Sequence, residues 1–401
     1  MIRMASVEQA LALIAEHGRS RATGAETVTL SDAVGRRLAE RVVAQVSQPP
    51  ADVSAMDGYA VKFADMKLGA PMKVIGESRA GKPYDGGIRP GEVVRIFTGA
   101  HMPSGADHVL IQEDTKRDGH IITVAAEQPE AANIRRKGLD FSEGDELVPA
   151  GHVMTEGAIS LAAGANAAKV SVRKLPRVGV LANGDELVAP GSKLEPGQVV
   201  NSIQPALMAL IRRWGAEPVG LGVGRDDEAD VRKRIDSAPC DVIVPIGGAS
   251  VGDYDVVRTA FAAEGFKPIF EKIAVKPGKP TWFSEQGKRL ALGLPGNPAA
   301  AMVTAQLFLK PLIDTLISAP PAPRAIRRAH TSRALPAAGN REEYLRAILS
   351  IDAEGAAIVV AAENQDSSLL SPFLTANALI RRPPNAPATA AGDLVEIVML
   401  S

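Results

Sequence analysis

A glycine-rich segment between an apolar strand pattern and a helix pattern is the first candidate for chemistry. The segment GGASVGDYD, residues 247–255, follows the apolar run DVIVPI. Glycines carry no Cβ, so backbone N–H groups can approach an anion, and the free amides at the start of a helix attract phosphate. A tight strand-to-helix turn is the alternative interpretation. We expect Gly247, Gly248, Ser250 and Gly252 to bind an anionic substrate, with the Ser250 hydroxyl as a further donor.

Two proline-rich turns belong to the same part of the chain. LPGNP, residues 294–298, follows another apolar run, and VKPGKP, residues 275–280, precedes that run. Prolines hold such loops with little loss of ordering entropy on binding. Lys272, Lys276 and Lys279 place positive charge where phosphate or an oxyanion such as molybdate could bind. A solvated basic surface is the alternative for these lysines.

Carboxylates also occur where predicted strands end, in NGDEL (Asp185, Glu186), GRDD (Asp226, Asp227) and GDYD (Asp253, Asp255). Anions repel an anionic ligand unless a cation lies between them. Mg²⁺ is typically held by one or two carboxylates and bridges to phosphate oxygens, so a divalent cation would remove this conflict. Helix capping is the alternative, and for Asp227 it is the favoured one.

A third group of polar residues occupies turns between residues 52 and 146. The motifs are DVSAMDGYA, FTGA and NIRRKGLD. Packing can explain Tyr59 and Ile134, but it does not explain Asp57, Thr98 and Asp140 at successive polar turn tips. Each motif alone is weak evidence for a site.

Composition excludes several other classes of function. A net charge of -1 gives no global field for nucleic acid or a membrane surface, and the single Cys240 cannot form an intramolecular disulfide, which fits a reducing cytosol. The first 18 residues contain no apolar stretch long enough for a signal sequence, and no membrane span is expected. The six histidines show no paired ligand spacing, and no GxSxG, Walker or clear Rossmann pattern occurs.

The elements that would position these motifs follow from hydrophobic patterning. Apolar runs at 178–181, 217–223, 241–246 and 289–292 predict strands, and helical patterns near 202–214, 227–237 and 254–265 separate them. This alternation predicts a doubly wound parallel sheet. In such folds ligands bind at the carboxyl ends of the strands, where the motifs of this region occur.

Changes in pattern divide the chain into four expected segments. Pro49 and Pro50 precede a mostly β region at 52–146, which is inserted into a helix-containing linking domain formed by 1–51 and 147–175. The α/β domain covers 176–325. After a long predicted helix at about 297–318 and the linker SAPPAPRA, residues 326–401 predict a small β barrel or sandwich.

The ordered motifs SAMDGYA, FTGA, NIRRKGLD, NGDEL, GRDD, GGASVGDYD, VKPGKP and LPGNP resemble those of the MoeA family, which includes the carboxyl-terminal domain of gephyrin. NQDSSLLSPFLTANALI is similar to the family's Gln-x-Ser stretch. The resemblance implies a MogA-like α/β domain, a C-terminal β barrel, and a homodimer whose cleft joins this α/β domain to the partner's inserted domain. It implies a cytoplasmic molybdenum insertase that converts molybdate and adenylylated molybdopterin, assisted by Mg²⁺ or another divalent cation, with release of AMP.

The resemblance also assigns roles to residues. It implies catalytic roles for Asp57, Thr98 and Asp140, and we expect the two aspartates to activate water or steer protons. It implies metal binding by Glu186, Asp226 and Asp255. The substrate-binding positions, from the resemblance and the turns together, are Gly247, Gly248, Ser250, Gly252, Lys272, Lys276, Pro295, Gly296, Pro298 and Ser368.

Molybdopterin adenylyltransferase and apo-molybdoenzymes are expected transient partners of such an enzyme. Two other functions remain open at this point. A molybdopterin adenylyltransferase shares the α/β domain, but its typical chain is less than half as long and carries a Gly-Gly-Thr-Gly turn. A non-catalytic scaffold similar to gephyrin would not need carboxylates around an anion site.

Overall fold

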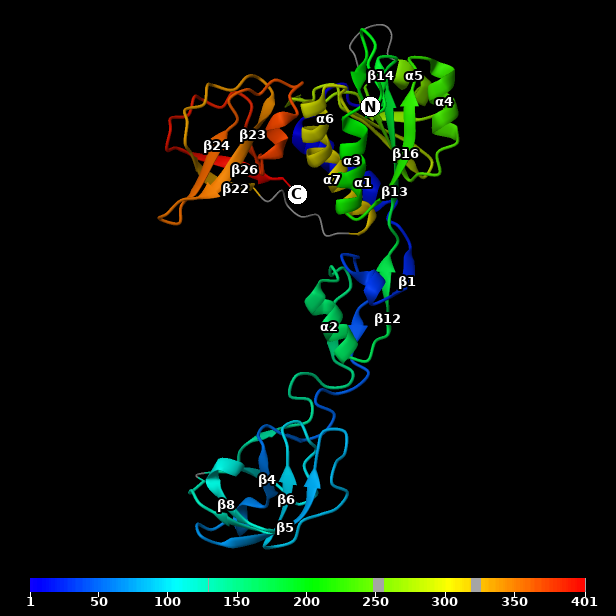
Figure 1. The fold of residues 1–401 in the computed structure, drawn as a ribbon. Helices are drawn as coiled ribbons and strands as arrows, with labels where there is room; N and C mark the ends of the chain where they lie inside the picture. The colour runs from blue at the N-terminus through cyan, green and yellow to red at the C-terminus, as the bar shows by residue number, and fades with distance from the viewer. Residues whose placement is uncertain (129, 248–255, 319–325, 401) are drawn as a thin grey trace. The chain divides into compact units, whose positions relative to one another are not determined.

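The chain consists of two compact units (Figure 1). The computed structural model describes residues 1–128, 130–247, 256–318 and 326–400. One unit contains Met1–Glu26 and Arg173–Ser401, and the second contains Thr27–Val172. The first unit carries an α/β domain and a C-terminal barrel, and the second carries a linking part and a mostly β domain.

A six-stranded sheet forms the centre of the α/β domain. In order across the sheet, the strands are β16 (Glu217–Gly224), β13 (Arg177–Asn183), β17 (Val242–Ile246), β21 (Arg289–Gly293), β20 (Trp282–Gln286) and β18 (Lys267–Phe270). The first four are mutually parallel, as expected. The antiparallel edge formed by β20 and β18 was not predicted. Only Gly287 and Lys288 separate β20 from β21, whereas a parallel crossover needs about a dozen residues or more.

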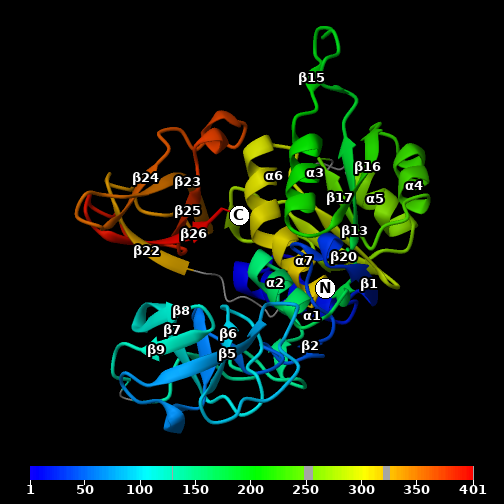
Figure 2. The same ribbon diagram turned by 60° about the horizontal axis from the view of Figure 1, so that its bottom comes forward.

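Helices cover both faces of this sheet, which confirms the doubly wound arrangement (Figures 1 and 2). One face packs on α1, α3 and the segment α6–η4–α7 through a single large core, and the other packs on α4 and α5 around a second core. The helices are α1 (Val7–Arg19), α3 (Ile203–Arg213), α4 (Glu228–Asp236), α5 (Val256–Ala263), α6 (Pro298–Thr304), η4 (Ala305–Leu309) and α7 (Lys310–Leu316). The Asp227 carboxylate accepts a hydrogen bond from the Asp230 N–H and caps α4, as expected.

The helix that follows LPGNP changes its winding in the middle. Its central turn, η4, is a π-helix that ends immediately before Lys310 and Pro311. Proline has no N–H and its ring clashes with the preceding turn, and a locally wider turn accommodates it. By length and composition alone, Pro298–Leu316 could cross a membrane. However, 72% of its apolar window is buried, as is usual for a core helix.

The C-terminal strands close into a barrel. Each of five strands pairs with two others, and the pairing of β23 with β25 completes the ring. The strands are β22 (Ile326–Thr331), β23 (Glu342–Ile351), β24 (Ala357–Ala361), β25 (Ala378–Arg382) and β26 (Leu394–Met399), with the short helix η5 (Ser371–Leu374) between β24 and β25. The strand β19 (Val275–Lys276) of the α/β domain pairs with β23.

The second unit contains the inserted β domain. Its six-stranded sheet has the order β7 (His108–Ile111), β4 (Gly58–Val61), β6 (Glu92–Ile96), β5 (Pro71–Ser78), β9 (Ile121–Val124) and β8 (Thr115–Asp118). The remaining β strands of this domain are β3 (Val53–Ser54) and β10 (Ile134–Arg135), and the short helices are η2 (Phe63–Asp65) and η3 (Gln112–Asp114). This sheet lies within residues 52–146, the region that was expected to be mostly β.

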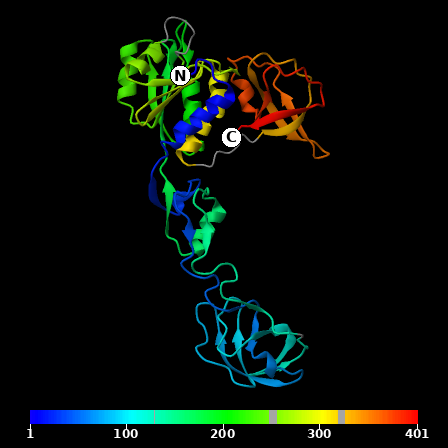
Figure 3. The ribbon, with the colours of Figure 1, turned by 180° about the vertical axis from the view of Figure 1, so that it is seen from behind.

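The linking part contains one helix and several short strands around a small alanine-rich core. Its elements are β1 (Ala25–Thr29), η1 (Ser31–Ala33), β2 (Val42–Val43), β11 (Glu146–Val148), α2 (Glu156–Gly164) and β12 (Lys169–Arg173). The N-terminal helix α1 does not belong to this part. It packs against α7 in the first unit, whereas the sequence analysis placed residues 1–51 together in the linking domain (Figure 3, blue and yellow). Buried Ala10 and Ile14 of α1 join the α/β core and account for this difference.

Candidate functional site

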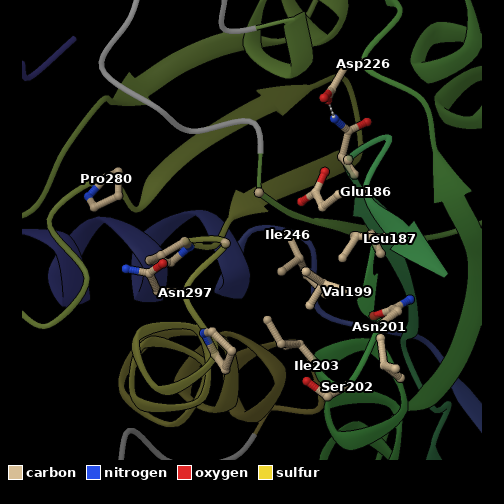
Figure 4. A pocket seen from close by; sticks show the side chains of 18 of the residues that line it. Glu186, Leu187, Val199, Asn201, Ser202, Ile203, Asp226, Ile246, Pro280 and Asn297 are labelled. Carbon is tan, nitrogen blue, oxygen red and sulfur yellow. Dashed lines mark hydrogen bonds between the residues drawn. The ribbon is translucent and has the colours of Figure 1, made fainter. Parts of the chain in front are cut away.

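A cavity of the α/β domain lies where its parallel strands end (Figure 4). Its volume is about 760 Å³. Asn183 at the end of β13, Ile246 at the end of β17 and the turn Pro295–Pro298 after β21 line it. One wall is apolar and is built by the parallel pair β14 (Leu187–Val188) and β15 (Val199–Val200). The sequence predicted a ligand site at this edge of the sheet.

Two carboxylates and one amide form the acidic side of the cavity. Glu186 and Asp226 both line it, and the Nδ2 of Asn183 donates a 2.6 Å hydrogen bond to the Asp226 Oδ1 (Figure 4). Asn183 is only 5% exposed, and its Oδ1 has no hydrogen-bond partner. A buried amide oxygen without a partner costs about 1–3 kcal/mol. The oxygen lies beside Gly224 of β16, where an added Cβ would be 2.9 Å from it, and it is closed off from the cavity. Asn183 therefore acts on the site through its bond to Asp226.

The base of the cavity requires two glycines. Gly247 has a φ of +86°, and a Cβ there would lie 2.9 Å from the Asn183 backbone oxygen. A Cβ on Gly296 would lie 3.3 Å from the Gly247 Cα. The two turns therefore approach each other closely, and their backbone amides lie near the ligand space.

Four predicted positions of the glycine-rich loop lie outside the described residues. They are Gly248, Ser250, Gly252 and Asp255. Of the substrate-binding positions predicted in the described part of the chain, Gly247, Pro295, Gly296 and Pro298 line the cavity.

Lys276 and Lys279 lie on the neighbouring VKPGKP segment, and Lys272 lies just before it. Pro280 of this segment lines the cavity, but Lys272 and Lys276 are not among the lining residues. The Nζ of Lys276 pairs at 3.2 Å with Glu343 of the barrel strand β23, and 56% of its side chain is exposed. A Cβ on Gly278 would lie 2.2 Å from the Thr304 side chain, so only glycine lets this segment pack on α6.

The barrel contributes a serine to the rim of the cavity. The Nδ2 of Asn297 donates to the Ser367 Oγ at 2.9 Å, and the Ala299 N–H donates to the Ser367 carbonyl at 2.8 Å. The predicted Ser368 instead bonds Asp366 through its N–H (2.8 Å) and its hydroxyl (2.6 Å). The structure therefore brings Ser367, and not Ser368, to the cavity residues. In the Gln-x-Ser stretch, Ser367 is the serine at the third position.

In the second unit, Asp57 and Thr98 form a direct contact. The Asp57 Oδ1 accepts 2.8 Å hydrogen bonds from both the N–H and the hydroxyl of Thr98. These bonds, first that of the N–H and then that of the hydroxyl, lower the pKa of the Asp57 carboxyl, and the charge of Arg95 lowers it further. Asp57 is therefore ionised near neutral pH, so it can accept a proton but carries none to donate.

Asp140 occupies a different place in this unit. It is exposed, and its N–H donates to the Gln48 carbonyl at 2.9 Å. Asp57 lies shortly after the C-terminal end of β3, and in the same segment the Ala55 N–H donates to the Asn133 carbonyl. The described contacts thus do not join the two predicted catalytic aspartates.

The donor atoms of the cavity fit a hard divalent cation. Across the described ranges, no group of three or more His, Cys, Asp or Glu side chains is close enough to hold a metal. Glu186 and Asp226 nevertheless supply carboxylate oxygens on one side of the cavity. Mg²⁺ needs only one or two protein carboxylates, because waters and substrate phosphates complete its coordination.

Family models cover almost the whole chain. Residues 5–165 match the "MoeA N-terminal region (domain I and II)", residues 179–315 the "Probable molybdopterin binding domain", and residues 328–400 the "MoeA C-terminal region (domain IV)". These ranges include the inserted β domain, the cavity and the barrel.

Individual relatives give the same result. The molybdopterin molybdenumtransferase of Haemophilus influenzae is 33% identical over 384 residues, which are 94% of this chain and 94% of the relative. The molybdopterin molybdenumtransferase of Nostoc is 37% identical over 73% of this chain and 69% of its own length. The crystal structure of a molybdopterin biosynthesis MoeA protein from Pyrococcus horikoshii has a TM-score of 0.86 at 28% identity and covers 99% of both chains. The chain therefore belongs to the MoeA family.

Proposed function

We propose that this chain is a molybdenum insertase, which transfers molybdenum from molybdate to adenylylated molybdopterin and releases AMP. The observation that carries the proposal is the strand-end cavity with Glu186 and Asp226 on one side, where Asn183 holds the Asp226 carboxylate. Its apolar wall suits a pterin ring, and its oxygen donors suit a cation beside phosphate. The names of the relatives, molybdopterin molybdenumtransferase, support the same activity.

A divalent cation, Mg²⁺ for example, would be held by Glu186 and Asp226, and would neutralise the charge of the substrate phosphates when bound. Asn183 orients the Asp226 carboxylate through their 2.6 Å hydrogen bond. The backbone at Gly247 and Gly296 lets the pterin phosphate approach the turns closely. Lys272 and Lys276 attract the anionic substrates toward this edge of the sheet.

The reaction needs proton transfer as well as binding. Molybdate loses oxo groups as water when the two dithiolene sulfurs bind, and each oxo group needs two protons to leave as water. The ionised Asp57, held by Thr98, is suited to accept protons from the dithiolene thiols or from water. Asp140, which is exposed, is the second proposed carboxylate for this work.

We further propose that the enzyme is a cytoplasmic homodimer. The inserted domain with Asp57 and the α/β domain with Asp226 each hold an incomplete set of groups, and the family resemblance joins them across subunits. Molybdopterin adenylyltransferase would deliver the substrate, and apo-molybdoenzymes would receive the product. Light scattering in dilute buffer tests the dimer, and a monomer with full activity would contradict the shared cleft.

The decisive assay for the activity measures nucleotides. Purified protein is incubated with adenylylated molybdopterin and Mg²⁺, with and without molybdate, and AMP is quantified by chromatography. We expect AMP release that depends on molybdate. Consumption of ATP with bare molybdopterin would instead identify an adenylyltransferase, and absence of both activities would favour a scaffold.

A further inference from the structure

An arginine lies directly behind the Asp57 turn. Arg95 belongs to β6 and faces Tyr59 of β4 as its cross-strand neighbour. The Cζ of Arg95 lies 5.0 Å from the centroid of the Tyr59 ring and 4.9 Å from that of the Phe97 ring. A guanidinium that stacks on two rings is held in a narrow range of orientations.

Arg95 donates hydrogen bonds to two residues that adjoin Asp57, one next to it in sequence and one bonded to its backbone. Its Nη1 donates to the Gly58 carbonyl at 3.1 Å, and its Nη2 donates to the Gln112 Oε1 at 2.6 Å. Gln112 in turn donates its N–H to the Asp57 carbonyl at 3.2 Å. Arg95 therefore fixes the residue that follows Asp57 and the residue that binds the Asp57 backbone.

We propose that Arg95 is a positioning residue for molybdenum transfer: it locks the Asp57 turn, so that the Asp57 Oδ2 is presented to the substrate in one orientation. The Thr98 bonds both end on Oδ1, which leaves Oδ2 available. This inference rests on the proposed function, because only that reaction gives the Asp57 carboxylate a substrate.

Arg95 of β6 places a positive charge near Asp57. Its partner Gln112 also donates from Nε2 to the Glu113 carboxylate of η3 at 3.3 Å. The charge of Arg95 helps to lower the pKa of Asp57, although the Thr98 bonds have the larger effect. Loss of Arg95 should therefore raise the pKa of Asp57 as well as loosen its turn.

The test compares Arg95→Met and Arg95→Lys with the matched control Arg79→Met. Arg79 also lies over the Phe97 ring, at 5.9 Å, but it pairs with Glu77 and its side chain is 64% exposed. The pKa of Asp57 is measured from the ¹³C shift of its carboxyl carbon. We expect it to rise in Arg95→Met, to change less in Arg95→Lys, and to be unchanged in Arg79→Met.

Kinetics of the full-length protein give the second readout. With adenylylated molybdopterin and molybdate, Arg95→Met should lower kcat about 10–100-fold, because misplacement of a catalytic group by about 1 Å has effects of this size. The KM for the pterin should change less than about threefold, because the pterin is held mainly by the α/β cavity. A merely structural loss would lower the amount of folded enzyme without moving the pKa of Asp57.

A folded Arg95→Met variant with wild-type kcat and an unchanged pKa of Asp57 would overturn the inference, as would an equal kcat loss in Arg79→Met. If Arg95→Met does not fold, Gln112→Leu removes the second anchor without changing the charge. It should still lower kcat, and wild-type kcat in that variant would also overturn the inference. If the wild type transfers no molybdenum but the pKa of Asp57 responds as expected, the proposed function fails while the contact between Arg95 and the Asp57 turn stands.

Discussion

The surroundings of the Asn183 amide lead to a specific prediction about Asn183→Leu. Leucine keeps approximately the size of asparagine but removes both amide atoms. One of them donates to Asp226, and the other is buried without a partner. The substitution should therefore leave the stability of the cation-free protein nearly unchanged and weaken its affinity for a divalent cation.

The magnitudes follow from these two contacts. The lost hydrogen bond to a charged carboxylate costs about 1.5–3 kcal/mol, and removal of the unsatisfied oxygen returns about 1–3 kcal/mol. The free energy of unfolding without a cation should therefore change by less than about 1 kcal/mol. Groups that hold or orient a metal ligand contribute about 10–100-fold in affinity, which equals about 1.4–2.7 kcal/mol. Cation affinity should fall by that factor.

The measurements are urea unfolding with a chelator and titration with Mn²⁺ followed by electron paramagnetic resonance. Asn377→Leu is the control, because both amide atoms of Asn377 bond the backbone of Leu349 in the barrel. Loss of these two hydrogen bonds should cost about 1–3 kcal/mol in unfolding and leave Mn²⁺ affinity unchanged. Wild-type Mn²⁺ affinity in Asn183→Leu would refute the proposal that Asn183 orients Asp226 for a cation.

Three further predictions concern single contacts. Thr98→Val removes a hydroxyl donor and should raise the pKa of Asp57, and an unchanged ¹³C titration of its carboxyl would contradict this. Burial lowers the pKa of His108, so its neutral form is favoured in the folded state. Its contribution to stability should be complete above about pH 6.5 and lost as the pH falls through the lower folded pKa. Urea unfolding at pH 8 and pH 5 tests this, and His108→Gln should reduce the difference in unfolding free energy between the two pH values. Gly247→Ala should lower Tm more than Gly287→Ala. Both glycines have a positive φ, which costs alanine about 1–2 kcal/mol, but only at Gly247 would the new Cβ also clash, since at Gly287 it has no atom within 4 Å.

The sequence predicted the central part of the α/β domain because that part has a simple pattern. Strand β17 is buried at every position and α3 has a clear apolar face, so both stand out from their surroundings. Strands β18 and β20 were not predicted. Strand β18 contains Pro268 and is exposed at two of its four positions. Strand β20 ends in two polar residues that are half-buried, so neither strand shows a continuous apolar run or a regular alternation.

The site was predictable where a residue type and a strand end coincide. Glu186 and Asp226 follow parallel neighbours β13 and β16, so their position at one edge follows from topology. The role of Asn183 did not follow, because the burial of one amide oxygen depends on residues far along the chain.

Contacts between distant segments also escaped prediction. Ser367 and Ser368 are adjacent and chemically identical, and contacts of Ser367 with distant residues distinguish them: the Asn297 side chain, 70 residues away in sequence, and the Ala299 N–H. The pairing of Lys276 with Glu343 depends on the barrel in the same way. Such choices are made by tertiary packing, which local pattern does not encode.

The most direct test of molybdenum insertion counts metal on the pterin. Purified protein is loaded with fluorescent adenylylated molybdopterin, exposed to molybdate and Mg²⁺, and separated from free ions. Molybdenum and pterin are then quantified together for the wild type and Asp57→Asn. We predict close to one molybdenum per pterin in the wild type, with AMP released in step, and retained pterin with formation slowed by about two to four orders of magnitude in Asp57→Asn. Retained pterin without molybdenum in the wild type would contradict the account.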